Sequence, residues 1–404
     1  MNVNEQVEYL MQGTEYGDEK LKQNMADELR TRLISCEREG RPLRVYCGFD
    51  PRKADLHLGH TVPMRKLRQF QELGHDVSFV IGNYTSLIGD PSDKDVLRPQ
   101  LTTSEVEENG RTYAEQAFRI LDPAKTKIRY NADWLAGLTF EQLIKLASNF
   151  TIQQFLTREN FKLRWDKGDA VYLHETFYSI MQGYDAFSLK ADVQVGGTDQ
   201  LFNIMTASRK IMTYLGELPN IAIILGILPG TDGVVKMSKS LGNHIPINTD
   251  ANDMFGKVMS IPDSAMAQFF RLVTPLTPPE IAEIENGIKT GTLHPRDAKM
   301  RLASEIVAAF YSKEEAISSQ NVFIATFQKG TVPEDTPKCK LVEGQSIVDL
   351  LVKQELAKSR NEARRLLEQN GVKFEGVTIV EPSLVLKEEG VLQVGKRHFL
   401  KLIK

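Results

Sequence analysis

The stretch Leu43-Arg-Val-Tyr-Cys-Gly-Phe49, followed by Asp50-Pro51, decides the fold. Its apolar run predicts a buried strand that ends at the aspartate–proline pair. A loop then leads to a helix over residues 64–73, whose apolar side chains recur three apart and which ends at Gly74. Asp76 to Ile81 predicts a second buried strand. Strand, helix and strand with short joints predict an α/β protein with a doubly wound, Rossmann-like parallel sheet.

The sequence on either side of this unit extends the same pattern. Residues 1–40 favour amphipathic helix, and the strand pattern resumes at Ala191 to Val195 and at Ile221 to Leu228. Between them, residues 91–190 favour helix apart from a loop around Asp133. We interpret this segment as a helical insertion between strands of the sheet.

Three further segments follow the Rossmann-like domain, which we expect to span residues 1–245. Residues 246–330 predict a run of helices separated by prolines, and hence an all-α domain. Residues 331–342 are polar and contain prolines, which is typical of an interdomain linker. Residues 343–404 predict two short helices and then strands, with a turn near Glu375-Gly376.

Length, composition and charge bound the class of protein. The chain has 404 residues, which at ~150 per domain indicates roughly two to three domains. With 41% hydrophobic and 25% charged residues, it has the composition of a globular protein rather than a disordered or fibrous one. The 50 basic and 53 acidic residues give a net charge of −3, which excludes a histone-like protein but not a local basic patch.

The cysteines and the apolar runs indicate the compartment. Cys36, Cys47 and Cys339 are odd in number and scattered, which fits neither a disulfide framework nor a metal knuckle. The first residues have neither a basic start nor an apolar run, and the longest apolar run is far too short to cross a bilayer. We therefore expect a cytoplasmic protein with no protein-held metal.

The first chemical motif lies where the first strand gives way to the helix, at Tyr46 to Pro51 and His57-Leu-Gly-His60. An open parallel sheet binds ligands at the carboxyl ends of its strands, and a helix N-terminus favours a phosphate. Gly59 allows close approach of a base or ribose, while both imidazoles can donate to phosphate oxygens. Alone, the motif also fits a helix start with two chance histidines; zinc is disfavoured because no cysteine or acidic ligands accompany the pair.

The second motif is Lys236-Met-Ser-Lys-Ser240, in a loop after the last strand. Two lysines three residues apart, flanked by serines and glycines, suit a mobile arm that clamps a polyphosphate. Most lysine–serine loops are merely solvated basic turns. Five specified residues after a His-x-Gly-His motif are nevertheless rare by chance, and we favour the polyphosphate function.

Together the two motifs resemble the signatures of class I aminoacyl-tRNA synthetases, and their neighbours narrow the resemblance to tyrosyl-tRNA synthetases of the bacterial type. The resemblance is strong from Leu43 to Asn243 and loose over the helices that follow. Residues 346–376 resemble an S4-like RNA-binding module. The one visible departure is Leu58, where the family motif has isoleucine, a conservative change.

The resemblance implies a residue-by-residue site. It assigns Tyr46 and Asp185 to the substrate phenol hydroxyl and Asp90, Tyr178 and Gln182 to its α-amino group. Further positions in the tyrosine pocket are Gln194 and Gln200, with Thr85 and Asn131 nearby. The ATP side corresponds to Cys47, Gly48, Asp50, His57, Gly59, His60, Gly196, Asp199, Lys236, Met237, Ser238, Lys239 and Ser240.

The spacing of the tyrosine-pocket residues agrees with this assignment. Tyr178, Gln182 and Asp185 stand at i, i+4 and i+7, so they share one helix face. A carboxylate with neutral acceptors suits an ammonium group. Core packing is the alternative for the tyrosines. A buried Asp185 needs a hydrogen-bond donor, and a substrate hydroxyl is such a donor.

A third cluster, Lys358, Arg360, Arg364 and Arg365, lies on a short helix whose Ala363, Leu366 and Leu367 are expected to face inward. A solvated charged face is the default interpretation of such a helix. The S4-like pattern favours RNA binding instead, and Lys396-Arg397 would add to the patch.

The implied function is a tyrosine–tRNA ligase. ATP and tyrosine would give tyrosyl-adenylate and pyrophosphate, with His57, His60, Lys236 and Lys239 stabilising the phosphates and no general base needed. The tyrosyl group would then pass to the terminal ribose of tRNA(Tyr). The family implies Mg²⁺ with ATP and a homodimer built partly through residues 91–190.

Three alternatives compete with this function. Tryptophanyl-tRNA synthetases share the fold, but Tyr46, Asp185 and the S4-like tail favour tyrosine. A small-molecule adenylyltransferase can also carry His-x-Gly-His, but it would lack the lysine loop and the RNA module. A non-enzymatic RNA-binding protein on a former synthetase scaffold predicts a damaged catalytic motif, and neither motif is damaged.

Overall fold

The computed structural model describes residues 1–51, 56–91, 102–327, 336–341, 344–354, 356–386, 388–395 and 398–403. The chain forms two compact units, Met1–Ile317 and Ser318–Lys404, and the boundary between them falls inside one helix. Within the described ranges no helix is long and apolar enough to cross a membrane.

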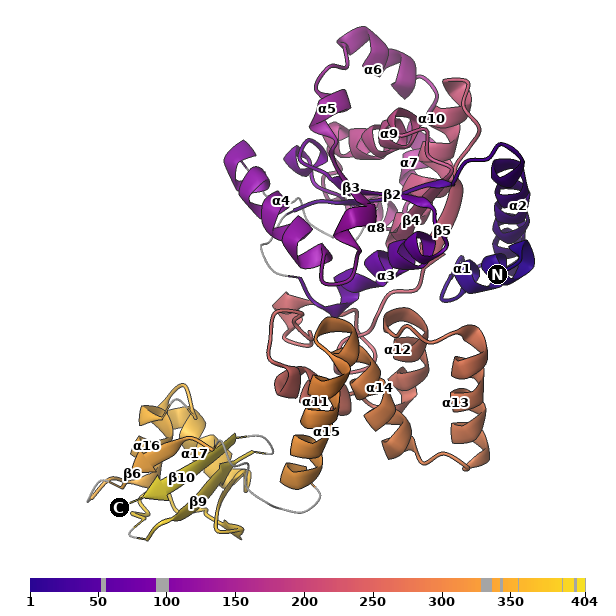
Figure 1. Ribbon diagram of the computed structural model, residues 1–404. Helices are drawn as coiled ribbons and strands as arrows, with labels where there is room; N and C mark the ends of the chain where they lie inside the picture. The colour runs from indigo at the N-terminus through magenta and orange to yellow at the C-terminus, as the bar shows by residue number, and fades with distance from the viewer. Residues whose placement is uncertain are drawn as a thin grey trace. The chain divides into compact units, whose positions relative to one another are not determined.

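The first unit is built on a parallel sheet of five strands in the order β3-β2-β1-β4-β5 (Figure 1). Every neighbouring pair is parallel, which confirms the predicted doubly wound sheet. The strand order reverses between β1 and β4, and an open α/β sheet binds its ligand at such a point. The strands are β1 (Arg44–Phe49), β2 (Asp76–Ile81), β3 (Thr126–Tyr130), β4 (Val193–Gly197) and β5 (Ile221–Leu225).

The edge strand β3 corrects the sequence interpretation of residues 91–190 as a purely helical insertion. Thr126–Tyr130 pairs with β2 and completes the sheet. Because it lies at the edge, its side chains stay exposed or half-buried, and it lacks the apolar run that marks the inner strands. Asp133, which we expected in a loop, lies in the short helix α5 (Ala132–Leu135).

Helices cover both faces of this sheet (Figure 1). Helix α3 contacts β1, β2 and β4, while α9 and α10 pack with Tyr46 and Val80 on the other face. The helices of the sheet region are α1 (Val3–Met11), α2 (Glu19–Arg38), α3 (Leu58–Glu72), α4 (Thr103–Ala117), α5, α6 (Phe140–Ala147), α7 (Ile152–Leu156), α8 (Glu159–Lys167), α9 (Leu173–Ser188), a π-helix (Phe202–Ser208) and α10 (Arg209–Tyr214).

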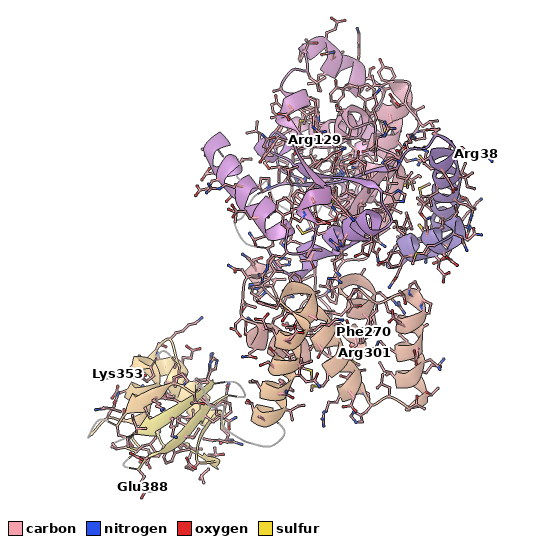
Figure 2. The ribbon with its side chains drawn as sticks, viewed as in Figure 1. Arg38, Arg129, Phe270, Arg301, Lys353 and Glu388 are labelled. Carbon is pink, nitrogen blue, oxygen red and sulfur yellow. The ribbon has the colours of Figure 1, made fainter. Side chains whose placement is uncertain are left out.

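The remaining helices follow the sheet and are separated at prolines, as the sequence predicts. Thr277 caps α13 and Pro278 opens it, which is the preferred place for proline in a helix. Phe270 is fully buried among these helices, whereas Arg38 projects outward at the end of α2 (Figure 2). The helices are α11 (Ala251–Met259), α12 (Met266–Val273), α13 (Pro278–Thr290), α14 (Pro295–Phe310) and α15 (Lys313–Phe327).

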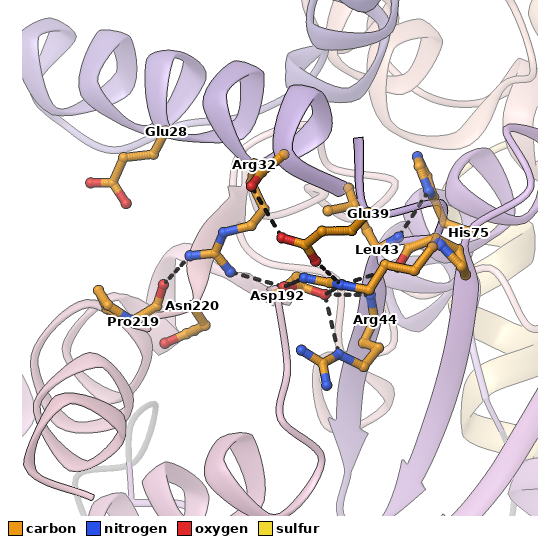
Figure 3. A network of polar contacts seen from close by, with 12 residues as sticks. Glu28, Arg32, Glu39, Leu43, Arg44, His75, Asp192, Pro219 and Asn220 are labelled. Carbon is orange, nitrogen blue, oxygen red and sulfur yellow. Dashed lines mark hydrogen bonds and ion pairs between the residues drawn. The ribbon is translucent and has the colours of Figure 1, made fainter. Parts of the chain in front are cut away.

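An ionic network joins β1 and β4 at the amino ends of these two strands (Figure 3). Asp192, just before β4, accepts hydrogen bonds from Arg32 at 3.0 Å, from Arg41 at 2.7 Å and from the backbone N–H of Arg44 at 2.9 Å. Burial opposes ionisation of Asp192, but these hydrogen bonds outweigh it and lower the pKa of the carboxyl to about 2. The network thus fixes the two strands that flank the switch point.

Besides the end of α15, the second unit contains a five-stranded sheet, in the order β6-β10-β9-β7-β8, and the helices α16 and α17. Its core lies between the helices and one face of the sheet and includes Leu351, Leu367, Leu392 and Leu402. The elements are β6 (Lys338–Lys340), α16 (Ile347–Lys353), α17 (Arg360–Glu368), β7 (Val372–Phe374), β8 (Val377–Thr378), β9 (Gly390–Val394) and β10 (His398–Ile403).

The prediction of a linker over residues 331–342 is wrong in part. Lys338–Lys340 forms β6, which pairs with β10 and brings Cys339 against the core of the second unit. The alternation of exposed and half-buried side chains in β6 is only three residues long, so the sequence of this strand resembles a polar linker. Residues 331–335 and 342, together with Lys396-Arg397, lie outside the described residues.

Candidate active site

A cavity of about 1130 Å³ opens at the carboxyl ends of β1, β4 and β5 in the first unit. Both sequence motifs line it: Cys47, Gly48, Asp50, His57, Gly59 and His60 from the first, and all five residues from Lys236 to Ser240 from the second. Gly196 and Asp199, after β4, line it too. The residues predicted for the ATP side are therefore brought together at the switch point of the sheet.

The same cavity is lined by nearly all residues predicted to bind tyrosine. These are Tyr46, Asp90, Tyr178, Gln182, Asp185 and Gln200, with Thr85 and Asn131. Gln194 is the exception and corrects the prediction, because its buried amide lies outside the cavity lining. Its Oε1 accepts a hydrogen bond from Asn220 Nδ2 at 2.9 Å, just before the neighbouring strand β5.

Asp185 lies buried on α9 at one end of the cavity and has protein donors of its own. Trp134 Nε1 donates to its Oδ1 at 2.7 Å, and Asn131 Nδ2 donates to its Oδ2 at 3.3 Å. Burial raises the pKa of Asp185 to about 8 despite these two hydrogen bonds. Asp185 thus has two protein donors besides any substrate hydroxyl, and Trp134 is a residue that the sequence interpretation missed. Tyr46 OH lies nearby and donates to the backbone oxygen of Gln182 at 3.4 Å.

At another wall of the cavity, Asp90 is held between Gln200 and a buried arginine. Gln200 Nε2 donates to Asp90 Oδ2 at 2.5 Å, and Arg158 Nη2 lies 3.8 Å from Asp90 Oδ1. Arg158, also missed by sequence reasoning, donates to Ser179 Oγ at 2.8 Å. Gln182 Oε1 is buried and accepts no hydrogen bond from any described residue, so it offers an acceptor to a ligand in the cavity.

Tyr178 and Asp50 connect the two groups of predicted residues. Tyr178 OH donates to Asp50 Oδ2 at 3.1 Å, and Thr85 Oγ1 donates to Asp50 Oδ1 at 2.8 Å. Burial and the neighbouring Asp50 raise the pKa of Tyr178 well above its ordinary value, so its hydroxyl stays a donor. The carboxylate from the first motif is thus fixed by two side chains of the tyrosine pocket.

The two histidines of the first motif stack at the start of α3. Their ring centroids lie 3.8 Å apart, and the backbone N–H of His57 donates to His60 Nδ1 at 3.1 Å. Burial, with the nearby His60, lowers the pKa of His57 to about 2, so the ring is neutral at physiological pH. A Cβ at Gly59 would lie 3.1 Å from the His57 ring, which explains the glycine. Leu58 is fully buried, so the departure from isoleucine concerns the core.

The lysine loop lies beside the first motif, since a Cβ at Gly59 would be 3.6 Å from Met237 Cβ. Lys236 Nζ lies 3.3 Å from Asp199 Oδ2, and Met237 is buried with 2% of its surface exposed. Lys239 opens a short 3-10 turn, Lys239–Leu241. The two lysines of the loop therefore border the cavity at the end where the histidines lie.

The basic cluster of the second unit lies on and just before α17. Lys358, Arg360, Arg364 and Arg365 are exposed, while Ala363 and Leu367 face the core as predicted. Arg360 Nη2 lies 2.7 Å from Asp349 Oδ1.

Comparison with known proteins gives consistent matches. The family model of class I tRNA synthetases (W and Y) matches residues 38–328. A tyrosine–tRNA ligase of Desulfotalea psychrophila is 44% identical over 93% of this chain and 94% of that protein, and one of Carboxydothermus hydrogenoformans is 46% identical over 93% and 94%. The crystal structure of a tyrosyl-tRNA synthetase with L-tyrosine from Archaeoglobus fulgidus has a TM-score of 0.60 at 20% identity, covering 79% of this chain and 100% of that one, which shows a shared fold.

Proposed function

We propose a role for each residue of the cavity on the premise that the chain belongs to the class I tRNA synthetases and, within them, to the tyrosine–tRNA ligases. The family is ATP-dependent, and its substrates are tyrosine, ATP and tRNA. The observation that carries the proposal is the single cavity that both motifs and the predicted tyrosine pocket share.

In the proposed orientation, tyrosine lies with its phenol hydroxyl at Tyr46 and Asp185. Its ammonium group lies among Asp90, Tyr178 and Gln182, with Gln200 holding Asp90 in place. The buried oxygen of Gln182, to which no described residue donates, supports this placement, since an N–H donor would satisfy it. The substrate carboxylate then points toward the end of the cavity that bears the two motifs.

The first step joins tyrosine to ATP. The tyrosine carboxylate attacks the α-phosphorus, the bond to the β-phosphate oxygen breaks, and pyrophosphate leaves. A carboxylate is already a nucleophile, so the enzyme supplies orientation and charge stabilisation rather than a base. His57, which is neutral, and its neighbour His60 donate hydrogen bonds to phosphate oxygens, while Lys236 and Lys239 neutralise the leaving pyrophosphate.

We assign the remaining ATP side from the same lining. Cys47, Gly48, Asp50, Gly59, Gly196 and Asp199 would contact the nucleoside, with Met237, Ser238 and Ser240 beside it. Magnesium would enter with ATP, whose phosphate oxygens are ligands of the kind that it prefers. Such an ion neutralises phosphate charge and usually keeps several waters.

In the second step the terminal ribose of tRNA(Tyr) takes the tyrosyl group, and the second unit would bind the RNA. Lys358, Arg364 and Arg365 project from the helical side as phosphate ligands. The opposite face of the sheet adds lysines: the strand register puts Lys338 beside Lys401. Lysines on an edge strand often serve to prevent pairing with another sheet. Because β10 lies between β6 and β9, this does not explain Lys401.

We also propose that two chains associate. Large apolar side chains from the segment 91–190 are more than half exposed, which is typical of a surface that another chain covers. They are Phe140, Ile144, Ile152, Trp165 and Leu173. A homodimer would cover them, and sedimentation of the purified chain tests this.

The division of labour follows the predicted segments: residues 1–245 catalyse, 246–330 contact the anticodon region, and 343–404 bind RNA as an S4-like domain. A cytoplasmic location suits the three cysteines, which are free thiols.

Selectivity between tyrosine and phenylalanine tests the tyrosine pocket. Asp185→Asn and Tyr46→Phe should each lower the preference for tyrosine, since a lost hydrogen bond costs ~0.5–1.5 kcal/mol, and more to a charged group. Unchanged selectivity in both variants would rule out the assignment.

A further inference from the structure

The side chain of Asn243 ties together the loop that carries the two lysines. It is 7% exposed, and its Nδ2 donates to Asp232 Oδ2 at 2.5 Å. The same Nδ2 lies 3.3 Å from the backbone oxygens of Val235 and Lys236. Its Oδ1 accepts from the backbone N–H of Ser238 at 2.8 Å. One amide therefore contacts residues on both sides of Lys236.

Asp232 completes this arrangement from the opposite arm of the loop. Its Oδ1 accepts from the backbone N–H groups of Val234 at 2.8 Å and Val235 at 2.7 Å. The Asn243 amide and these two N–H groups lower the pKa of the Asp232 carboxyl, so it is an ionised acceptor. We call the Asp232–Asn243 pair the loop latch.

The backbone at the base of the loop, at Gly230 and Thr231, packs closely against Asn243. A Cβ at Gly230 would lie 2.2 Å from Asn243 Nδ2, so any larger residue would displace the amide. The backbone N–H of Thr231 donates to the Asn243 backbone oxygen at 2.9 Å. The backbone N–H of Gly230 donates to the Val235 backbone oxygen at 2.8 Å. Both arms of the loop are thereby closed around Asn243.

The hydrophobic core contributes little to the tip of this loop. Val234 and Val235 are 85% and 50% exposed, so apolar burial does not hold the arm that leads to Lys236. Of the residues between the latch positions, Met237 is the one whose side chain is anchored in the core, with 2% exposed. Polar contacts must therefore fix the path of the backbone on either side of it.

We propose that Asn243, through its latch with Asp232, is a positioning residue for adenylate formation. It sets the backbone at Lys236 and Ser238, and with them the two lysine ammonium groups, at the edge of the cavity. This inference rests on the proposed function, in which Lys236 and Lys239 meet the leaving pyrophosphate. An amide suits the position because it donates to a carboxylate and to carbonyls while it accepts from an N–H.

The experiment compares Asn243→Ala and Asn243→Asp with the parent in tyrosine-dependent ATP–pyrophosphate exchange. Asn248→Ala, an exposed asparagine five residues later, is the matched control. We expect kcat to fall about 10–100-fold in both Asn243 variants, because misplacing a catalytic group by ~1 Å costs up to ~10²-fold. The Kd of tyrosine measured without ATP should stay within about two-fold, since none of the proposed tyrosine ligands lies in this loop.

A charge swap gives a second arm. Asn243→Asp sets two carboxylates against each other, and adding Asp232→Asn restores one donor and one acceptor across the latch. The double variant should therefore recover part of the rate lost by Asn243→Asp, a non-additivity that direct contact predicts. Trypsin should also cleave after Lys236 or Lys239 faster in Asn243→Ala than in the parent or in the Asn248→Ala control.

Two results would overturn the inference. Exchange within about two-fold of the parent in Asn243→Ala would show that the lysines need no latch. A parallel loss of rate, tyrosine affinity and Tm would show a general structural role instead. Lys236→Ala and Lys239→Ala separate this from the proposed function: if neither changes the exchange rate, the lysine function fails; if they slow it and Asn243→Ala does not, only the latch fails.

Discussion

Replacing Trp134 by phenylalanine removes one defined contact from the proposed phenol site. Trp134 Nε1 donates to Asp185 Oδ1 at 2.7 Å, and phenylalanine keeps an aromatic ring there but has no donor. Asp185 is 4% exposed, so water does not readily replace the lost hydrogen bond. The carboxylate form of Asp185 is thus selectively destabilised.

The size of the effect follows from the hydrogen bond to a charged group. Such a bond contributes ~1.5–3 kcal/mol, which at 1.36 kcal/mol per pKa unit corresponds to roughly one to two units. Burial already raises the pKa of Asp185 to about 8, and the substitution should raise it further. The ionised fraction near pH 7.5 should then fall by about 10–100-fold, and tyrosine affinity with it, because the carboxylate form accepts the phenol hydroxyl.

The assay is calorimetric titration of tyrosine from pH 6.5 to 9.5. In the parent, affinity should rise as pH increases toward the pKa of Asp185 and then level off; in Trp134→Phe the rise should move to higher pH. Tyr214→Phe is the matched control, because it also removes a polar group from an aromatic side chain and Tyr214 is 47% exposed. Parent-like affinity and an unshifted pH profile in Trp134→Phe would refute the placement of the phenol at Asp185.

Three other perturbations test separate parts of the account. Asp192→Asn should lower the free energy of unfolding by roughly 2 kcal/mol in denaturant titrations; because the pKa of Asp192 is lowered to about 2, the parent should have this contribution above pH ~4 and lose it as pH falls toward 2. Lys236→Ala should slow adenylate formation about 100–1000-fold in stopped-flow experiments while tyrosine affinity changes little, since the charge develops in the transition state. Truncation near residue 335 should preserve pyrophosphate exchange but lower tRNA charging; Arg364→Gln with Arg365→Gln should mimic that loss and weaken its salt dependence, whereas full charging by the truncated chain would contradict an RNA-binding second unit.

The parts of the fold that the sequence predicts are those where burial dominates. The strands at 44–49 and 76–81 and the helix between them carry apolar runs with the correct periods, and the structure confirms them. The shared face of α9 was equally predictable, because Tyr178, Gln182 and Asp185 follow the helical repeat and all line the cavity.

The sequence fails where a neighbour in space supplies what the local pattern lacks. Strand β3 is half-exposed at the sheet edge, and β6 has three residues, so neither shows a strand period long enough to identify it. Trp134 donates to Asp185, which is 51 residues away in the sequence. Arg158 lies near Asp90, which is 68 residues away. Only the folded chain reveals these two pairs. Gln194 has a suitable side chain, but Asn220, just before the next strand, already donates to its oxygen.

ATP–pyrophosphate exchange with each of the twenty amino acids in turn tests the central claim most directly. Exchange requires that the amino acid be activated by ATP in the cavity that both motifs line, and it needs no tRNA. We predict that tyrosine alone supports rapid exchange. Exchange that tryptophan supports as well as or better than tyrosine, or no exchange with any amino acid, would contradict it.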